Sequence, residues 1–393
     1  MKKMLFIISL TLVCGLVSCS SKSLTLSSKN LSTINADPDF FPIAVWLQNP
    51  DDAISYKNYG INMFVGIWGG LDQSKLDLLK ASDMKVLPEL NEFCRHNLNE
   101  PLIYGWLQGD EPDNAQWNER TQKYDPCIDP SIIIQNYNRI KEIDPSRPVY
   151  LNVGRGVAVN RWFGRGECTG ETDMYKISNN GYLKGCDIVS FDVYPVNSNE
   201  KEVKDSIWYV AKGLDSLRLW SDYSKPAWCW IETTKIGDEN ARKPTTAEVK
   251  SEVWMALIHG ASGIGYFCHS FSNPTNTAAF LHDKEMITSA GIINHQITSL
   301  ASILNSPTIQ NFVTVKSSNP LVPIDFIVKK KGKDYYVFAI SMRPDRSTAR
   351  FAIEKGKKVE VIGENRTLQI DKDGSFSDEF SDYSVHLYKI LSK

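Results

Sequence analysis

Strand-like and helix-like segments alternate about eight times between residues 41 and 306, and this alternation constrains the fold more than any other feature of the chain. Short apolar runs of strand length fall at 41–47, 61–68, 84–90, 102–108, 148–153, 186–193, 227–231 and 263–268. Segments with apolar residues at helical spacing separate many of these runs, and one more, at 283–304, follows the last. Eight such units in this length predict an α/β fold, the (β/α)8 or TIM barrel, over residues 37–307.

An open doubly wound sheet is the alternative interpretation of the same alternation. Such sheets usually carry a glycine-rich phosphate-binding turn after an early strand, and the sequence has none. The run at 186–193 is almost entirely apolar, as expected of a strand that is buried on both faces. The pattern therefore favours the barrel.

The pattern changes after residue 306. Short alternating runs follow one another, and turn sequences such as Pro344-Asp345 and Asp373-Gly374 separate them. This is typical of antiparallel strands, so we expect a small β-sandwich over residues 308–393. The region has no second acidic cluster, which favours packing support over catalysis, with carbohydrate binding as the alternative.

The N-terminus has the features of a bacterial lipoprotein signal. Lys2 and Lys3 precede an apolar run at 4–13 that is too short to span a bilayer. The following Leu16-Val17-Ser18-Cys19 resembles the lipobox, which implies that Cys19 is lipidated; an ordinary secretory signal is the alternative. We expect a signal peptide at 1–19, a Ser-rich flexible tether at 20–36, and an outer-membrane protein anchored at the periplasmic face or the cell surface.

Charge and residue spacing exclude several partners. The net charge of -2 gives no general attraction to nucleic acid. The sequence has neither an H-E-x-x-H motif nor a C-x-x-C pair, so we expect no metal and no cofactor. It carries no signal for an oligomeric state.

An oxidising compartment permits disulfide bonds. The sequence places four cysteines in predicted loops near barrel strands, where the pairs Cys94 with Cys127 and Cys168 with Cys186 are plausible, but it does not determine the pairing. Cys229 and Cys268 lie inside predicted strands, where buried free thiols are expected.

Two glutamates, Glu111 and Glu232, each follow a strand-like run. Residues at the C-terminal ends of barrel strands converge on one mouth, so two acids far apart in sequence can meet there. A pair of carboxyl groups is what cleavage of a glycosidic bond requires. Each glutamate also has a plainer explanation, because Glu111 precedes Pro112 at a possible helix start and Glu232 is compatible with a solvated loop.

The segment from Gly105-Trp106 to Asp110-Glu111-Pro112 resembles the fourth-strand motif of clan A glycoside hydrolases, which are retaining (β/α)8 glycosidases. The resemblance implies that Glu111 is the acid/base and Glu232, after the seventh strand, the nucleophile. It implies double displacement at β-glycosidic bonds of an oligo- or polysaccharide. The Asp-Glu-Pro-Asp form is similar to beta-galactosidase-like members and to lipoproteins of Bacteroidetes type, without defining one family.

The sequence departs from that clan at one position. An asparagine commonly precedes the acid/base in the clan, and here the residue is Asp110. A second negative charge beside Glu111 raises the proton affinity of Glu111, which favours the protonated acid. Asp110 is itself a candidate member of the proton-handling pair.

Other predicted strand ends supply candidate substrate contacts. Aromatic faces stack on sugar rings, and polar groups at a rim fix hydroxyls. The candidates are Trp46, Trp68, Asp110, Asn152, Asp192, Tyr194 and His269, with Glu89 and Asn91 as further ones. The clan resemblance implies that Tyr194 hydrogen-bonds the nucleophile. For each of them, packing at the barrel top is the alternative role.

The stretch at 154–185 follows the fifth predicted strand and should overhang the mouth. It carries Arg155, Arg161 and Arg165, which are suited to an acidic sugar or a sulfate; a solvated loop is the alternative. Two further functions stay open for the whole chain. One is a non-catalytic glycan-binding lipoprotein on a barrel scaffold, and the other is a transglycosylase that uses the same acids.

Overall fold

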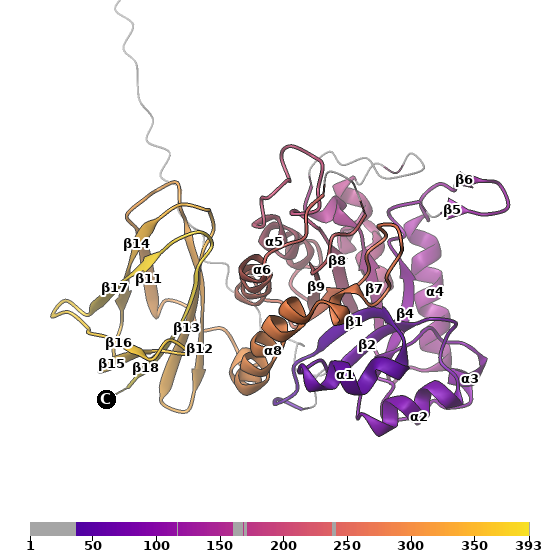
Figure 1. Ribbon diagram of the computed structural model, residues 1–393, viewed down its shortest axis with the longest axis horizontal. Coiled ribbons are helices and arrows are strands. Elements are labelled where there is room, and N and C mark those ends of the chain that lie inside the picture. The colour runs from indigo at the N-terminus through magenta and orange to yellow at the C-terminus, as the bar shows by residue number, and fades with distance from the viewer. Residues whose placement is uncertain (1–36, 116, 160–167, 169–170, 238–240, 393) are drawn as a thin grey trace, which may run out of the picture.

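The chain folds into a barrel of eight parallel strands, as the computed structural model shows for residues 37–115, 117–159, 168, 171–237 and 241–392 (Figure 1). The strand order is β3-β2-β1-β10-β9-β8-β7-β4. The bounds are β1 (Ile43–Gln48), β2 (Met63–Ile67), β3 (Lys85–Leu87), β4 (Trp106–Asp110), β7 (Val149–Val153), β8 (Ile188–Asp192), β9 (Ala227–Glu232) and β10 (Gly263–Phe267). The predicted TIM-barrel fold is confirmed.

The barrel closes between β3 and the segment that leads into β4. The backbone N–H of Tyr104 donates to the carbonyl of Val86, and that of Leu107 donates to the carbonyl of Pro88, both at 2.9 Å. All eight strands therefore point their C-terminal ends to one mouth, with β7, β8, β9 and β10 as the fifth to eighth barrel strands.

Helices surround the barrel. They are α1 (Ala53–Asn58), α2 (Gln73–Ala81), α3 (Glu92–Arg95), α4 (Pro130–Ile143), α5 (Tyr209–Trp220), α6 (Thr246–Ile258), α7 (Ala279–His282) and α8 (Lys284–Leu304). Short 3-10 turns are η2 (Pro50–Asp52), η3 (Arg155–Val157), η5 (Thr172–Met174), η6 (Ile177–Asn179) and η7 (Tyr182–Gly185). The start of α6 is fixed by a capping box between Thr245 and Glu248, which satisfies amides that the helix leaves unpaired.

Large aromatic side chains fill the barrel interior. Trp46 meets Trp230 edge to face with ring centroids 5.0 Å apart, and the indole N–H of Trp230 donates to the hydroxyl of Tyr150 at 2.9 Å. A Cβ on Gly265 of β10 would lie 2.2 Å from the Trp230 ring. Only glycine therefore lets β10 approach this indole.

The C-terminal region is an antiparallel β-sandwich. One sheet contains β11 (Val313–Ser317), β14 (Ser347–Ile353) and β17 (Ser375–Phe380). The other contains β12 (Ile324–Lys331), β13 (Asp334–Ser341), β18 (Val385–Leu391), β15 (Lys358–Val361) and β16 (Arg366–Leu368). A small hairpin, β5 (Trp117–Asn118) and β6 (Lys123–Tyr124), projects between β4 and α4 (Figure 1).

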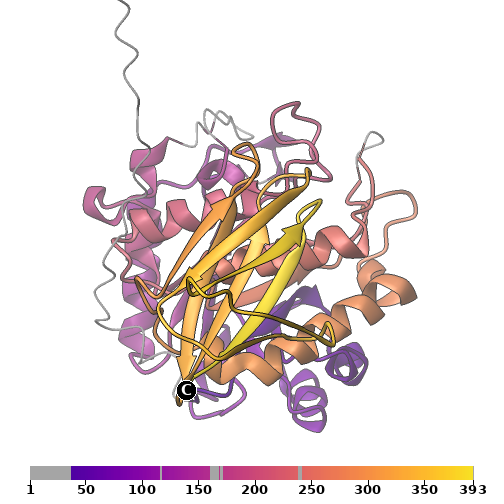
Figure 2. The same cartoon turned by 90° about the vertical axis from the view of Figure 1, so that its left-hand side faces the viewer.

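The five-stranded sheet lies against the outer helices of the barrel. The view of Figure 2 shows the sandwich in front of these helices. Trp254 of α6 meets Phe338 of β13 edge to face with ring centroids 5.4 Å apart. Phe338, Ile340 and Leu387 belong to the same cluster of buried apolar side chains as the barrel-to-helix layer. One hydrophobic core therefore runs from the barrel into the sandwich.

The two plausible disulfides, Cys94 with Cys127 and Cys168 with Cys186, are not formed in this structure, in which these thiols are free. The Cys168 thiol lies against Cys127 instead of Cys186. Burial raises the pKa of the Cys94 thiol to about 11 and that of the Cys186 thiol to about 12. The predicted free thiols Cys229 and Cys268 are both buried. Within the described residues, no helix has the length and apolar character needed to cross a membrane.

Candidate active site

An irregularity at the end of β4 places two adjacent acids at the mouth of the barrel. The register between β4 and β7 shifts between Gln108 and Asp110. The backbone φ is 25° at Gly109 and 40° at Glu111. The left-handed conformation is unfavourable for a non-glycine residue such as Glu111, and such strain is concentrated at functional sites. The amide of Glu111 is held by the carbonyl of Asn152 at 3.0 Å.

Asn152 of β7 joins Asp110 to Asp192, the last residue of β8. Its Nδ2 donates to Oδ1 of Asp110 at 2.9 Å and to Oδ1 of Asp192 at 3.2 Å. Its Oδ1 accepts from the Ser190 hydroxyl at 2.6 Å, which fixes the orientation of the amide. The three predicted residues Asp110, Asn152 and Asp192 therefore meet at one point of the mouth.

Glu111 and Asp113 lie side by side against the backbone of Gly154. A Cβ on Gly154 would come 3.0 Å from Oε1 of Glu111 and 3.3 Å from Oδ2 of Asp113. The other oxygen of Glu111, Oε2, accepts from the Asn114 amide at 2.9 Å. Asp113 is buried, and it accepts from the Gly154 N–H at 2.8 Å and from the Tyr175 hydroxyl at 2.7 Å. Burial and the Glu111 charge raise the pKa of Asp113 to about 7.

The acids at the mouth lie close enough together for their charges to raise the pKa values of neighbouring groups. Burial, followed by the charges of Glu111 and Asp110, raises the pKa of Asp192 well above its ordinary value. Burial and the charges of Asp192, Glu111 and Asp110 also raise the pKa of the Tyr194 hydroxyl. A raised pKa favours the protonated form of Asp192, which is the form that a general acid needs.

A pocket of about 230 Å³ opens beside Asp192. It lies between the loops that follow β8 and β9, and its lining includes Arg155, Asp192, Tyr194, Asn197, Ile236 and Phe271. Arg155 forms an ion pair with Glu200. Arg161 and Arg165, predicted beside it, lie outside the described residues.

Aromatic rings form a rim at the mouth. Trp68 is 50% exposed, and its ring stacks on that of His269 with centroids 5.8 Å apart. On the other side of His269, the 55% exposed Phe271 makes an edge-to-face contact at 5.8 Å. Phe267 links His269 to Tyr194, with centroids 5.1 and 5.2 Å away. Burial lowers the pKa of His269, so its ring is neutral at neutral pH.

Phe267 and Phe271 are rim residues that our sequence analysis missed. The signal is present in Phe267-Cys268-His269-Ser270-Phe271, where aromatic rings alternate past the eighth strand and so point to one side. Trp46, in contrast, is 6% exposed and packs inside the barrel. Asn91 caps α3 by accepting from the Cys94 N–H at 2.9 Å. Glu89 is exposed after β3.

Glu232 ends β9, as predicted, but its carboxylate is enclosed. Its Oε1 accepts from the N–H of Val196 at 2.7 Å, and its Oε2 accepts from the N–H of Asn197 at 2.9 Å and from the Asn197 amide at 2.6 Å. Its side chain also lies against Glu252 of α6. The exposed fraction of Glu232 is 0%. The structure therefore brings Asp110, Glu111 and Asp192 together, and holds Glu232 behind the pocket wall.

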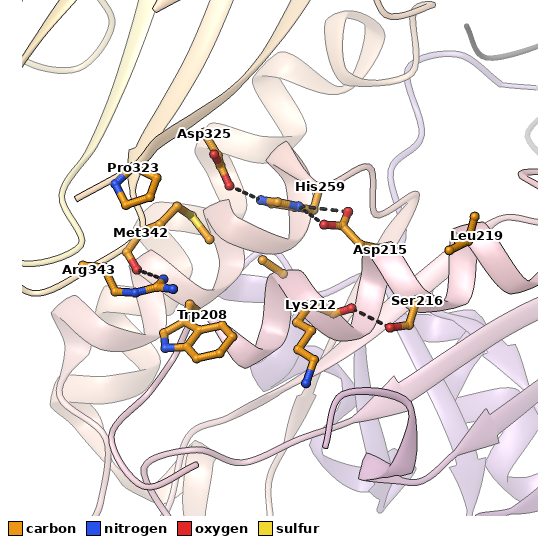
Figure 3. Close-up of a pocket in the computed structure, with 11 residues that line it drawn as sticks. Trp208, Lys212, Asp215, Ser216, Leu219, His259, Pro323, Asp325, Met342 and Arg343 are labelled. Carbon is orange, nitrogen blue, oxygen red and sulfur yellow. Dashed lines mark hydrogen bonds and ion pairs between the residues drawn. The ribbon is translucent and has the colours of Figure 1, made fainter. Parts of the chain in front are cut away.

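A second cavity, of about 360 Å³, lies where α5 and α6 face the sandwich (Figure 3). His259 stands between two carboxylates there, with Nδ1 at 3.0 Å from Asp215 and Nε2 at 3.2 Å from Asp325 of β12 (Figure 3). The arrangement joins barrel to sandwich. Throughout the described ranges, no group of three or more His, Cys, Asp or Glu side chains is arranged to hold a metal ion.

Comparisons with known proteins support the fold. No protein-family model matches the sequence, and no curated protein has a significantly similar sequence. Among solved structures, the α-amylase from Geobacillus thermoleovorans complexed with acarbose superposes with a TM-score of 0.55 at 13% identity, over 91% of this chain and 99% of that one. A putative α-galactosidase from Bacteroides fragilis gives a TM-score of 0.52 at 11% identity, over 90% and 80%.

A glycoside hydrolase family 5 protein from Bacteroides vulgatus gives a TM-score of 0.50 at 12% identity, over 90% of both chains. At such low identity these similarities define the fold. This chain therefore has a (β/α)8 barrel with a C-terminal β-domain, an architecture that recurs among glycoside hydrolases.

Proposed function

We propose that this protein is a glycoside hydrolase that cleaves glycosidic bonds in an oligo- or polysaccharide. One observation carries the proposal: Asn152 joins the carboxylates of Asp110 and Asp192 beside Glu111 at the C-terminal mouth of the barrel. Active sites of this fold lie at that mouth. Glycosidic cleavage needs a protonated carboxyl group on one side of the bond and an ionised one nearby.

Asp192 is the proposed general acid. Its raised pKa favours the protonated form, and Asp192 lines the pocket that would admit the substrate. The proton passes to the leaving oxygen as the glycosidic bond breaks. Asp110 or Glu111 then provides the negative charge that stabilises or attacks the anomeric carbon.

The spacing of the acids is compatible with retention of configuration. The Oδ1 atoms of Asp110 and Asp192 lie 2.9 and 3.2 Å from one nitrogen, so the distance between these two oxygens cannot exceed the sum of these distances. Two carboxyl groups held by one amide are compatible with the separation of roughly 5–5.5 Å that is typical of retaining enzymes. Double displacement with Asp110 as nucleophile fits this geometry.

The assignment based on the clan resemblance, with Glu232 as nucleophile and Glu111 as acid/base, stays a prediction. It requires Glu232 to leave three hydrogen bonds and to become accessible, because no part of its side chain is exposed in the structure. The preference for β-linked substrates also stays a prediction. The similar structures include an α-amylase with acarbose and a putative α-galactosidase, so they do not favour the β-configuration.

The test is hydrolysis of a panel of α- and β-linked oligosaccharides by the full-length protein and by Asp110→Asn, Glu111→Gln, Asp192→Asn and Glu232→Gln. We expect kcat to fall roughly 10²–10⁴-fold in Asp192→Asn, and in at least one of the variants Asp110→Asn and Glu111→Gln. If the wild type binds glycans but hydrolyses none, it is a glycan-binding protein. If it produces longer oligosaccharides, it is a transglycosylase.

We also propose attachment to the outer membrane through a lipid on Cys19, which lies outside the described residues. The support is the Leu16-Val17-Ser18-Cys19 sequence after an apolar run. Metabolic labelling with a fatty acid should mark the wild type and leave Cys19→Ser unlabelled. Labelling of both proteins, or of neither, would contradict the proposal.

A further inference from the structure

Glu232 organises the loop that forms one wall of the active-site pocket. Its carboxylate accepts from two successive backbone N–H groups, those of Val196 and Asn197, at 2.7 and 2.9 Å. Hydrogen bonds between backbone amides and a buried carboxylate are strong, and they leave the loop little freedom. The same loop begins directly after Asp192 and carries Tyr194.

Asn197 extends this arrangement to the loop after β9. Its side-chain amide donates to Oε2 of Glu232 at 2.6 Å and to the carbonyl of Thr234 at 2.9 Å. Its Oδ1 accepts from the N–H of Ile236 at 2.8 Å, and the carbonyl of Ile236 accepts from the N–H of Phe271 at 2.6 Å. Asn197, Ile236 and Phe271 all line the pocket. A continuous set of hydrogen bonds thus runs from Glu232 to the backbone of Phe271, the residue whose ring is exposed.

Glu252, which belongs to helix α6, also contacts the Glu232 carboxylate. It is fully buried and its carboxyl group lies against that of Glu232. Neither of its oxygens accepts a hydrogen bond from an N–H or O–H donor in the described part of the chain. Two ionised carboxylates in contact inside a protein repel each other and lack solvation, so one of the two must hold a proton.

We infer that Glu232 is a positioning residue that fixes the pocket wall, and that it shares one proton with Glu252 in a buried carboxyl pair. The protonated Glu252 donates to Glu232, whose remaining lone pairs hold the Val196–Asn197 segment. The effect on catalysis rests on the proposed glycosidase function. The hydrogen-bonding role is independent of that function.

The charges around the pair agree with this arrangement. Burial raises the pKa of Glu232 to about 7, and burial with the Glu232 charge raises that of Glu252 well above its ordinary value. Glu248 and Arg242 are the other charged groups that act on Glu252, and they neutralise each other in an ion pair. The Cys229 thiol of β9 also faces Glu252, and burial raises its pKa so that it stays neutral.

The first test compares Glu232→Gln with wild type by hydrogen exchange, which needs no substrate. A glutamine places an NH₂ group where two N–H donors and an amide now converge, so protection of the Val196 and Asn197 amides should fall. Glu142→Gln, an exposed position on α4, is the matched control and should behave as wild type. Unchanged protection of both amides in Glu232→Gln would overturn the inference.

Glu252→Gln tests the shared proton. Its amide can still donate to Glu232, so we expect a folded protein with protected Val196 and Asn197 amides. Burial and the Glu232 charge raise the pKa of the Glu252 carboxyl group well above its ordinary value of 4.5. In the wild type, the contribution of Glu252 to stability is therefore fully present below about pH 4.5 and is lost as pH rises through its raised pKa. The pH dependence of Tm should be flatter in Glu252→Gln, and an unchanged profile would contradict the shared proton.

Kinetics separate a positioning residue from a nucleophile. As a positioning residue, Glu232→Gln should raise KM and lower kcat by about 10²-fold or less, the cost of a small misplacement. Loss of a nucleophile would instead lower kcat by more than about 10⁴-fold with little change in fold. Azide would then restore turnover in Glu232→Ala, whose short side chain leaves room for the anion. If the wild type hydrolyses nothing, the function proposal fails, and the hydrogen-exchange and Tm results still decide the role of the pair.

Discussion

The carboxylates of Asp110 and Asp192 accept hydrogen bonds from the same nitrogen, Nδ2 of Asn152, at 2.9 and 3.2 Å. The two acids come from β4 and β8, and Asn152 comes from β7, the strand between them in the sheet. The amide therefore sets the distance between two acids that would otherwise repel each other. The consequences can be measured.

Replacing Asn152 with alanine should remove this restraint. We expect kcat to fall by about 10²-fold, because a displaced carboxyl group is misaligned with the scissile bond. The control is Ser190→Ala, which removes the hydroxyl bonded to Oδ1 of Asn152 but keeps the bridging amide. Steady-state kinetics should show a smaller loss for this control. Equal losses would mean that the bridge itself has no special role.

Asp192→Asn should remove the proton donor. Because the pKa of Asp192 is raised, loss of its proton should form the alkaline limb of the wild-type pH–rate profile, and this limb should disappear in the variant. Activity should fall by roughly 10²–10⁴-fold on natural glycans. The loss should be smaller on aryl glycosides, whose leaving groups need little protonation. A uniform loss on both kinds of substrate would argue against the acid role.

Phe271→Ala and Trp68→Ala should weaken substrate binding, because each removes an exposed ring at the mouth. We expect a cost of about 0.5–1.5 kcal/mol in binding free energy for each ring. Leu321→Ala, at a 78% exposed position of the sandwich, is the control and should bind as wild type. Isothermal titration with an oligosaccharide substrate in the Asp192→Asn background measures the effect without turnover. Wild-type affinity in both variants would exclude the rim as a sugar-binding surface.

The contact between barrel and sandwich at His259 should make stability depend on pH. Burial alone would lower the pKa of His259, but the Asp215 and Asp325 carboxylates raise it from 6.5 to about 9. The stabilisation is therefore fully present below about pH 6.5 and is lost as pH rises through about 9. At about 1.4 kcal/mol per pKa unit, the rise from 6.5 to about 9 corresponds to about 3.5 kcal/mol, and solvent screening of the partly exposed Asp215 and Asp325 carboxylates should reduce this to about 2–3 kcal/mol.

Thermal unfolding of wild type and Asp325→Asn across this range checks the His259 prediction. The variant keeps the shape of the side chain but removes one of the two charges, so its Tm should fall less steeply with rising pH. Parallel curves for the two proteins would contradict the prediction.

The sequence predicted the barrel because its strands are buried on both faces and read as apolar runs. The run at 227–231 corresponds to β9 (Ala227–Glu232), and the run at 263–268 to β10 (Gly263–Phe267). The hairpin β5–β6 was missed, since strands of two residues carry no periodic signal. Asp110, Asn152 and Asp192 were found because each lies at a strand end.

The direction in which the Glu232 side chain points could not be predicted from the sequence in the same way. By alternation along β9, Glu232 belongs to the same side as Trp228 and Trp230, which fill the barrel. Its hydrogen bonds to Val196 and Asn197, and its contact with Glu252, depend on a loop from another strand and on a helix further along the chain. Trp46 illustrates the same limit, because its contact with Trp230 inside the barrel is not encoded locally.

The hydrophobic core that runs from the barrel helices into the sandwich makes the two regions one cooperative unit. α6 presents Trp254 to Phe338 of the sandwich and carries Glu252 at the pocket wall. Removing the sandwich would expose to water the apolar side chains of α6, the helix that supports that wall. Calorimetry should therefore record one unfolding transition, and the sandwich could not be exchanged for another module without disturbing the chemistry at the mouth.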